Sequence, residues 1–200
     1  DDPHAETILR TAAKVGVKFY RTNWYKYDTS APVEKSLAEI EARLRALAQL
    51  NQDIGIRGNV QNHAGAYFGA AIWDLWHVLQ KVNSEWIGCQ YDIRHATVEG
   101  LGCWPLGLAA IMPHIQTLNF KDFAFKEKDG KLAVDNVPLG TGLVDFRRFF
   151  KLLAPPATSA PISLHSEYLP ERAPSGGSLN RDEIFASIKK DLAALKAILG

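Results

Sequence analysis

Short strand-like segments alternate with helix-like segments along almost the whole chain, and this alternation constrains the fold more than any other feature. Segments rich in β-branched and aromatic residues predict five strands, at 17–23, 56–62, 86–92, 117–123 and 161–169. Helical periodicity predicts helices at 5–15, 32–50, 70–82, 105–116, 143–153 and 181–199. Most of the strands are apolar without clean alternation, which is typical of parallel strands covered by helices. The sequence therefore predicts an α/β fold.

The order of these elements leaves two architectures open. Five βα units fit an open doubly wound sheet or part of a (β/α)8 TIM barrel, which is complete at about 250 residues. A nucleotide-binding sheet usually has a glycine-rich loop after its first strand, whereas TNWYKYD stands here at 22–28. The Asp129-Gly130 pair predicts a hairpin turn inside a polar segment. No linker or low-complexity tract interrupts the chain, so we expect one domain over 1–200.

Composition excludes several classes of protein. The chain is 46% hydrophobic and 22% charged, with a net charge of +1, which argues against a disordered chain and against a nucleic-acid or anionic membrane partner. Apolar runs stay far short of the ~20 residues of a membrane span, and two cysteines imply no disulfide framework. The chain begins at Asp1 without a start methionine, so the compartment is taken as cytoplasmic by default, or periplasmic if a signal peptide was removed.

Polar side chains gather where the predicted strands end. Residues two apart in a strand share a face, which pairs Gln61 with His63, Gln90 with Asp92, Asn119 with Lys121, and His165 with Glu167. Parallel α/β folds bind ligands at the carboxyl ends of their strands, and buried polar side chains cost free energy unless they are paired. These four pairs therefore predict a site at that end. Imidazole and carboxylate groups suit a divalent metal, and they suit acid–base catalysis without a metal equally well.

Several segments together resemble the xylose isomerase-like barrel superfamily, which includes sugar phosphate isomerases and epimerases and relatives of endonuclease IV. They are QNHAG (61–65), GCQYDIRHATVEG (88–100), LNFKDF (118–123), VPLGTGLVDF (137–146) and SLHSEY (163–168). The resemblance runs from about residue 12 to the end of the chain. Members are TIM barrels, so the five units resemble strands four to eight, in a domain incomplete at its N-terminus. Such a barrel segment predicts unpaired strand edges and an exposed apolar inner face, and it leaves room for a homo-oligomer.

The resemblance also implies a set of metal ligands. A divalent cation (Mn, Mg, Co or Zn) would be held by the residues at the family's ligand positions, namely Gln61, Asp92, His95 and Glu167, with His165 in place of Glu167 if the register differs by one pleat. The family's seventh-strand histidine falls on Asn119. Two of the four usual ligands are therefore amides here. Because an amide oxygen carries no charge, we expect weaker metal binding.

The function that the resemblance implies is a sugar isomerase or epimerase, which moves a proton next to a carbonyl group of a carbohydrate. Glu167 or His165 would transfer the proton, and Lys121 would stabilise the oxyanion. Substrate would also contact His63, Arg94 and Asn119. The alternative is a non-catalytic carbohydrate-binding barrel, which the two amides favour because neither can act as a base. An endonuclease IV-like nuclease is disfavoured, since it would need a richer metal cluster and excess positive charge.

Overall fold

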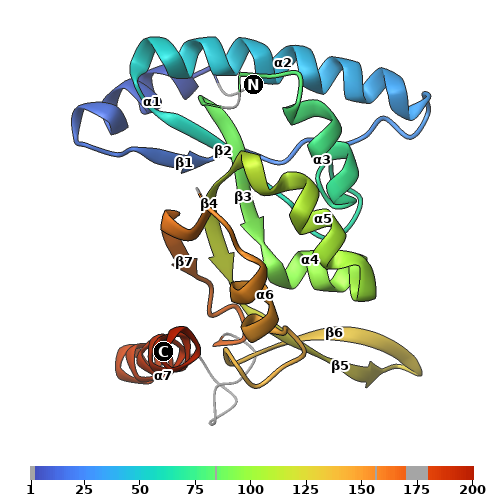
Figure 1. Ribbon diagram of the computed structural model, residues 1–200, viewed down its shortest axis with the longest axis vertical. Helices are drawn as coiled ribbons and strands as arrows, with labels where there is room; N and C mark the ends of the chain where they lie inside the picture. The colour runs from blue at the N-terminus through green and yellow to red at the C-terminus, as the bar shows by residue number, and fades with distance from the viewer. Residues whose placement is uncertain (1–2, 84, 156, 170–179) are drawn as a thin grey trace.

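The computed structural model describes residues 3–83, 85–155, 157–169 and 180–200. Its main sheet has five strands in the order β1 (Phe19–Arg21), β2 (Arg57–Gln61), β3 (Ile87–Asp92), β4 (Ile115–Phe120) and β7 (Ile162–Leu164). All neighbouring strands in this sheet are parallel, which confirms the predicted order. The strands curl as part of a (β/α) barrel with helices outside them (Figure 1), so the open doubly wound alternative is wrong.

The described residues form seven α-helices and three short 3-10 helices, of which α1 precedes the first strand and α7 follows the last one. The α-helices are α1 (Ala5–Lys14), α2 (Val33–Ile54), α3 (Ile72–Leu79), α4 (Ile93–Gly100), α5 (Trp104–Ile111), α6 (Phe146–Leu152) and α7 (Arg181–Leu199). The 3-10 helices are η1 (Leu101–Cys103), η2 (Met112–His114) and η3 (Ala157–Ser159). Buried side chains such as Leu44, Leu75 and Phe149 pack these helices onto the outer face of the sheet. None of the helices in the described ranges is long and apolar enough to cross a membrane.

Three differences from the predicted elements matter for the site. Helix α4 starts directly after β3, in a segment for which we predicted no helix. The predicted strand 117–123 runs from Ile115 to Phe120, after a register shift between β3 and β4. The last predicted strand, 161–169, is shortened to Ile162–Leu164, so the side chains that follow it do not alternate between the two faces of the sheet.

An antiparallel hairpin follows β4 and projects from the sheet (Figure 1). It consists of β5 (Asp122–Lys128) and β6 (Lys131–Val137). Asp129 and Gly130 turn it with φ angles of 53° and 72°, and positive φ at both central residues is the requirement of a type I′ turn. The predicted hairpin turn is confirmed. The Pro-, Gly- and Ser-rich segment 170–178, for which the sequence predicts a loop, lies outside the described residues.

The inner face of the sheet is polar, so the expected apolar inner face is wrong. Val60, Tyr91 and Phe120 belong to the core shared with the helices, and the residues that alternate with them point to the opposite, concave side. These alternating residues include Asn59 and Gln61 on β2, Gln90 and Asp92 on β3, and Asn119 on β4. Of the two faces of the sheet, the outer one contributes to the hydrophobic core. The edge strands are β1 and β7, as predicted for a barrel segment.

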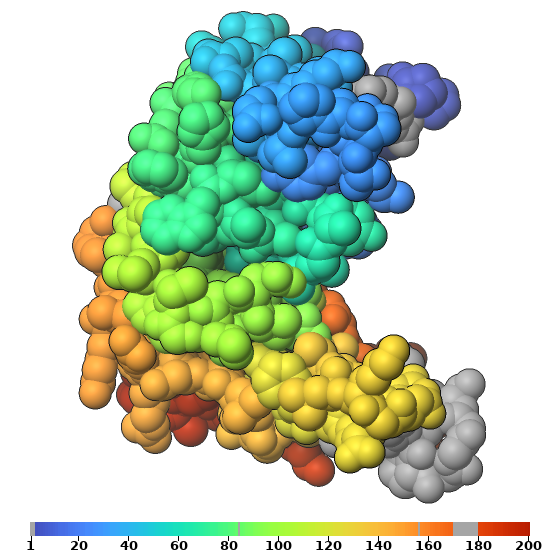
Figure 2. Space-filling view, turned by 90° about the vertical axis from the view of Figure 1, so that its right-hand side faces the viewer, coloured from blue at the N-terminus to red at the C-terminus, as the bar shows by residue number. Residues whose placement is uncertain are grey.

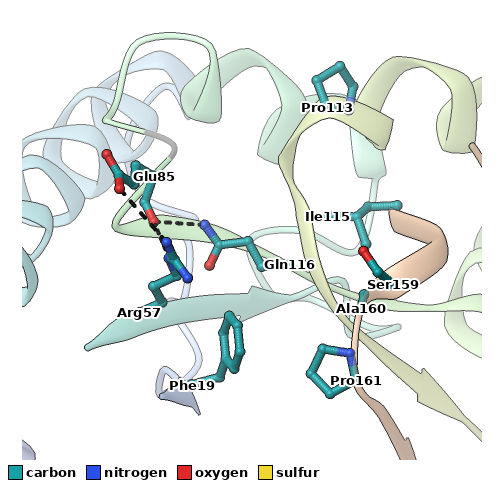
Figure 3. Close-up of a pocket in the computed structure, with 9 residues that line it drawn as sticks. All are labelled: Phe19, Arg57, Glu85, Pro113, Ile115, Gln116, Ser159, Ala160 and Pro161. Atoms are coloured by element: carbon teal, nitrogen blue, oxygen red, sulfur yellow. Dashed lines mark hydrogen bonds and ion pairs between the residues drawn. The ribbon is translucent and has the colours of Figure 1, made fainter. Parts of the chain in front are cut away.

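The two ends of the sheet differ in what they offer a ligand. Near the amino ends lies an open pocket of about 400 Å³, where Arg57 Nε and Gln116 Nε2 both donate to the backbone carbonyl of Glu85, at 3.2 and 3.0 Å (Figure 3). Parallel α/β barrels place their chemistry at the opposite end. The molecule is hollowed on one side, between the segment after β2 and the β5–β6 hairpin (Figure 2).

Candidate functional site

Asp92 is the centre of the candidate site, at the carboxyl end of β3. It is fully buried, and it is also the N-cap of α4, because its Oδ1 accepts from the backbone N–H of His95 at 3.1 Å. Its own backbone pairs with the Asn62 side chain, which accepts from the Asp92 N–H at 2.7 Å and donates to the Asp92 carbonyl at 3.0 Å. The strand end and the helix start together fix the direction of this carboxylate.

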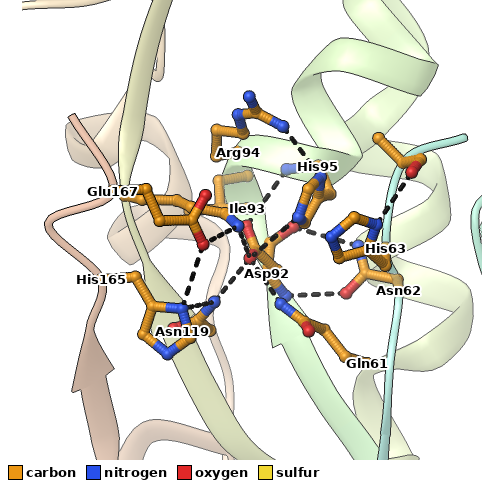
Figure 4. Close-up of polar contacts among 12 residues, drawn as sticks. Gln61, Asn62, His63, Asp92, Ile93, Arg94, His95, Asn119, His165 and Glu167 are labelled. Carbon is orange, nitrogen blue, oxygen red and sulfur yellow. Dashed lines mark hydrogen bonds and ion pairs between the residues drawn. The ribbon is translucent and has the colours of Figure 1, made fainter. Parts of the chain in front are cut away.

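The second oxygen of Asp92, Oδ2, faces three donors from neighbouring strand ends, two of which, Gln61 and Asn119, are labelled in Figure 4. Gln61 Nε2 lies at 2.9 Å, Asn119 Nδ2 at 2.6 Å and Lys121 Nζ at 3.5 Å. Gln61 turns its oxygen the other way, where it accepts from the Arg21 guanidinium at 3.1 Å. Both amides therefore present N–H groups to the carboxylate, and hydrogen bonds to an ionised acceptor are the strong kind.

Lys121 links Asp92 to a second carboxylate. Its ammonium donates to Glu167 Oε1 at 2.8 Å, and the lysine is only 3% exposed. His165 Nδ1 lies 3.5 Å from the same Glu167 oxygen. The pKa of Glu167 is lowered to about 2, most strongly by the hydrogen bond from His165 and less strongly by the hydrogen bond from Lys121. Glu167 is thus ionised at neutral pH, and the ammonium lies between two negative charges.

His95 is held as a neutral imidazole by its neighbour in α4. Arg94 donates to His95 Nδ1 at 3.0 Å, and because a guanidinium has no acceptor, Nδ1 carries the lone pair and Nε2 carries the proton. Nε2 lies 3.6 Å from Asp92 Oδ2. Burial lowers the pKa of His95 far below its usual value. Arg94 is itself anchored, since it donates to Asn136 of β6 at 2.8 Å and lies 5.6 Å from the centroid of the Phe123 ring.

An aromatic group borders the polar centre. His63 packs against His95, Trp24 and Tyr67, with ring centroids 4.1, 5.2 and 5.7 Å apart. Its Nδ1 contacts the Ala64 carbonyl at 2.9 Å, and burial lowers its pKa. Trp24 is 43% exposed, which leaves ring surface for a ligand. Polar donors beside aromatic rings are a combination suited to a small polar molecule with apolar faces.

A divalent cation does not fit between Asp92 and Glu167 as their side chains lie, because the Lys121 ammonium is already there. An ion about 4 Å from that ammonium would be repelled by about 8 kcal/mol at an effective dielectric constant of about 20. Across the described parts of the chain, no three His, Cys, Asp or Glu side chains are grouped so that they could hold a metal. The predicted ligand set of Gln61, Asp92, His95 and Glu167 therefore stays a prediction from the sequence.

The structure brings together the residues that the sequence singled out and adds others that it missed. His63, Arg94, Asn119, Lys121 and His165 all lie around Asp92, directly or through one neighbour. The missed residues are Arg21, Trp24, Asn62, Tyr67 and Asn136. Strand alternation assigns Asn62 to the outer face, but β2 ends at Gln61, so the alternation no longer applies. Its position between two candidate site residues was the available signal.

Comparison with known proteins gives a consistent assignment of the fold. A family model described as xylose isomerase-like TIM barrel matches residues 4–191. A search of curated protein sequences found no match. A similar solved structure is a xylose isomerase domain protein from Planctomyces limnophilus, at 16% identity and a TM-score of 0.64, covering 97% of this chain and 64% of that one.

Two further similar structures are complexes with a ligand. D-allulose 3-epimerase from Methylomonas sp. in complex with D-allulose is 19% identical with a TM-score of 0.62, covering 96% of this chain and 67% of that one. A xylose isomerase-like TIM barrel protein from Mycobacterium smegmatis in complex with magnesium is 12% identical with a TM-score of 0.65, covering 97% and 65%. At these identities the likeness shows the fold. The chain spans about two thirds of the length of these proteins.

Proposed function

Because the chain belongs to the xylose isomerase-like TIM barrel family, we propose that it is a sugar isomerase or epimerase that moves a proton next to a carbonyl group of a carbohydrate. One observation carries the proposal: a buried ammonium, Lys121, is held between two carboxylates at the carboxyl end of the strands, with His165 beside it. Such an arrangement supplies both a donor for a developing oxyanion and a group that moves a proton. The sugar-binding neighbour in the same fold supports the substrate class.

Lys121 is the group that would stabilise negative charge. Asp92 keeps the ammonium charged in its buried position, and the bond to the partly exposed Glu167 can yield to a substrate oxygen. When a proton leaves the carbon beside the carbonyl, charge develops on the carbonyl oxygen, and the ammonium donates to that oxygen. A donor already in place costs little reorganisation at that moment.

His165 is the group that would carry the proton. His165 Nδ1 lies 3.5 Å from the ionised Glu167 and 3.3 Å from Asn119 Nδ2. In the tautomer that donates to Glu167, the lone pair on Nε2 is free to accept a proton from carbon and to return it to the same or the neighbouring carbon. Glu167 then stabilises the imidazolium that forms. Asn119 Oδ1 is buried without a partner among the described residues, so it is placed to accept a hydrogen bond from a sugar hydroxyl.

A second candidate function is sugar binding without catalysis. The observation in its favour is that Gln61 and Asn119 both donate hydrogen bonds from their side-chain amides to Asp92. Neither amide is a base, so proton transfer has only the His165 and Glu167 side of the site to rely on.

Proton exchange on a panel of aldoses and ketoses in D2O, followed by NMR, tests both functions. Wild-type protein is expected to exchange the proton beside the carbonyl of at least one sugar, and His165→Asn to slow that exchange by about 10²–10⁴-fold. His77→Asn, an exposed histidine on α3, is the matched control and should exchange as wild type does. Saturable sugar binding without exchange would support the second candidate instead. If no sugar is bound, both functions are refuted.

A further inference from the structure

We propose that the Lys121 ammonium takes the place of a divalent cation in this chain, so that the site is built to work without a metal ion. The proposal rests on the proposed function only for what the ammonium does during turnover. Its statement about metal binding depends on the site geometry alone. One solved structure of the same fold is described in complex with magnesium.

The first argument is position. Lys121 Nζ lies 2.8 Å from Glu167 Oε1 and 3.5 Å from Asp92 Oδ2, so one positive charge already joins the two carboxylates that face each other across the site. The lysine is 3% exposed, and it follows directly on β4, which fixes where its stem begins. A second positive charge between the same oxygens would have to displace this ammonium.

The second argument is the direction of the other candidate ligands. Gln61, Asn119 and His95 each aim a nitrogen at Asp92 Oδ2, and both amides donate to it. The His95 nitrogen on that side is the protonated one, because the opposite nitrogen accepts from a guanidinium. A cation needs lone pairs at these positions, and here it would meet hydrogens.

The third argument is what holds those directions in place. Gln61 accepts from Arg21, and His95 accepts from Arg94. Turning the Gln61 amide to offer its oxygen would place an NH2 group against the Arg21 guanidinium, donor against donor. Changing the His95 tautomer would do the same against Arg94. The two arginines therefore oppose the rearrangement that a metal would require, and both bonds are of the charge-assisted kind.

Mn²⁺ alone is the probe for the test. Protein dialysed against EDTA is titrated with MnCl2, with the bound ion followed by electron paramagnetic resonance and the melting temperature followed in parallel. Wild type is expected to bind no stoichiometric Mn²⁺ and to melt at the same temperature with and without it. Lys121→Met leaves two carboxylates without their shared cation, so its Mn²⁺ affinity is expected to exceed that of wild type by about tenfold or more. Lys126→Met, which removes an exposed lysine paired with Asp135 on the hairpin, should match wild type.

Two results would overturn the proposal. One is a stoichiometric Mn²⁺ ion bound to wild type and lost in Asp92→Asn. The other is equal Mn²⁺ affinity in wild type and Lys121→Met, since the ammonium would then not be what excludes the ion. If Lys121→Met does not fold, the wild-type titration decides alone. Sugar exchange that persists in EDTA supports the proposal, exchange that requires Mn²⁺ overturns it, and failure of the proposed function shows separately as no exchange under either condition.

Discussion

Replacing Asp92 by Asn isolates the charge of the central carboxylate from its shape. The two side chains are nearly equal in size, but Asn offers one acceptor oxygen where Asp offers two. In the native site both oxygens are used, Oδ1 by the first turn of α4 and Oδ2 by the two amides and the ammonium. In either orientation of the substituted amide, its NH2 group must face buried donors. Asp92→Asn is therefore expected to destabilise the whole fold and to remove sugar exchange.

The magnitude follows from the contacts that remain. If the oxygen of the new amide replaces Oδ2, the helix cap is lost, at a cost of about 1 kcal/mol, and a backbone N–H faces an NH2 group, for a further 1–3 kcal/mol or so. Lys121 keeps Glu167 at 2.8 Å, so the loss stays near the lower end of the roughly 3–5 kcal/mol found when a buried pair is broken. We expect a loss of about 3 kcal/mol, equal to a fall in melting temperature of roughly 6–12 °C for a domain of this size.

Urea unfolding, followed by circular dichroism, measures this loss. Asp53→Asn is the matched control, because Asp53 is exposed on α2, where it accepts from Gln49, and its substitution should change the free energy of unfolding by less than about 0.5 kcal/mol. A loss below about 1 kcal/mol in Asp92→Asn would show that the donors around this carboxylate are not held as the structure has them.

Three further predictions concern other parts of the molecule. The imidazole and the ammonium beside Glu167 lower its pKa from 4.5 to about 2. Its contribution to the free energy of unfolding is therefore complete above pH 4.5 and is lost as the pH falls toward 2. In urea titrations across that range, Glu167→Gln should flatten the pH dependence of the free energy of unfolding. Asp191→Ala removes the buried acceptor of two hydroxyl groups that flank Glu167 and of a backbone N–H. Calorimetry should show that the free energy of unfolding falls by about 2–4 kcal/mol, and the rate of sugar exchange should fall. Unchanged stability would contradict this anchoring role. Burial raises the pKa of the Cys89 thiol, so a thiol reagent should label the exposed Cys103 in the folded protein and Cys89 only after unfolding; two fast-reacting thiols would contradict the burial.

The sequence by itself determined the order and direction of the strands, and it indicated the end of the sheet at which the candidate site lies. Strand-like and helix-like periods are local properties, and the right-handed parallel connection leaves few ways to arrange them. The Asp129-Gly130 turn was predictable for the same reason, since two positive φ angles are a demand on these two residues alone. The resemblance to sugar isomerases, and the convergence of His63, Asp92 and Lys121, also came from residues at strand ends.

The tertiary structure decided what each polar group faces. Helix α4 went unpredicted because its first turn, from Ile93 to His95, carries no strong helical signal apart from the Asp92 cap, and the cap bond forms only where β3 stops. The inner face proved polar because the covering helices take up the apolar side of every strand. Whether a Gln or a His offers a lone pair or a hydrogen depends on the group behind it, here a guanidinium that lies 40 residues away for Gln61. Such contacts between distant segments exist only in the folded chain, so the sequence could single out Asp92 and Glu167 but could not show that the Lys121 ammonium lies between them.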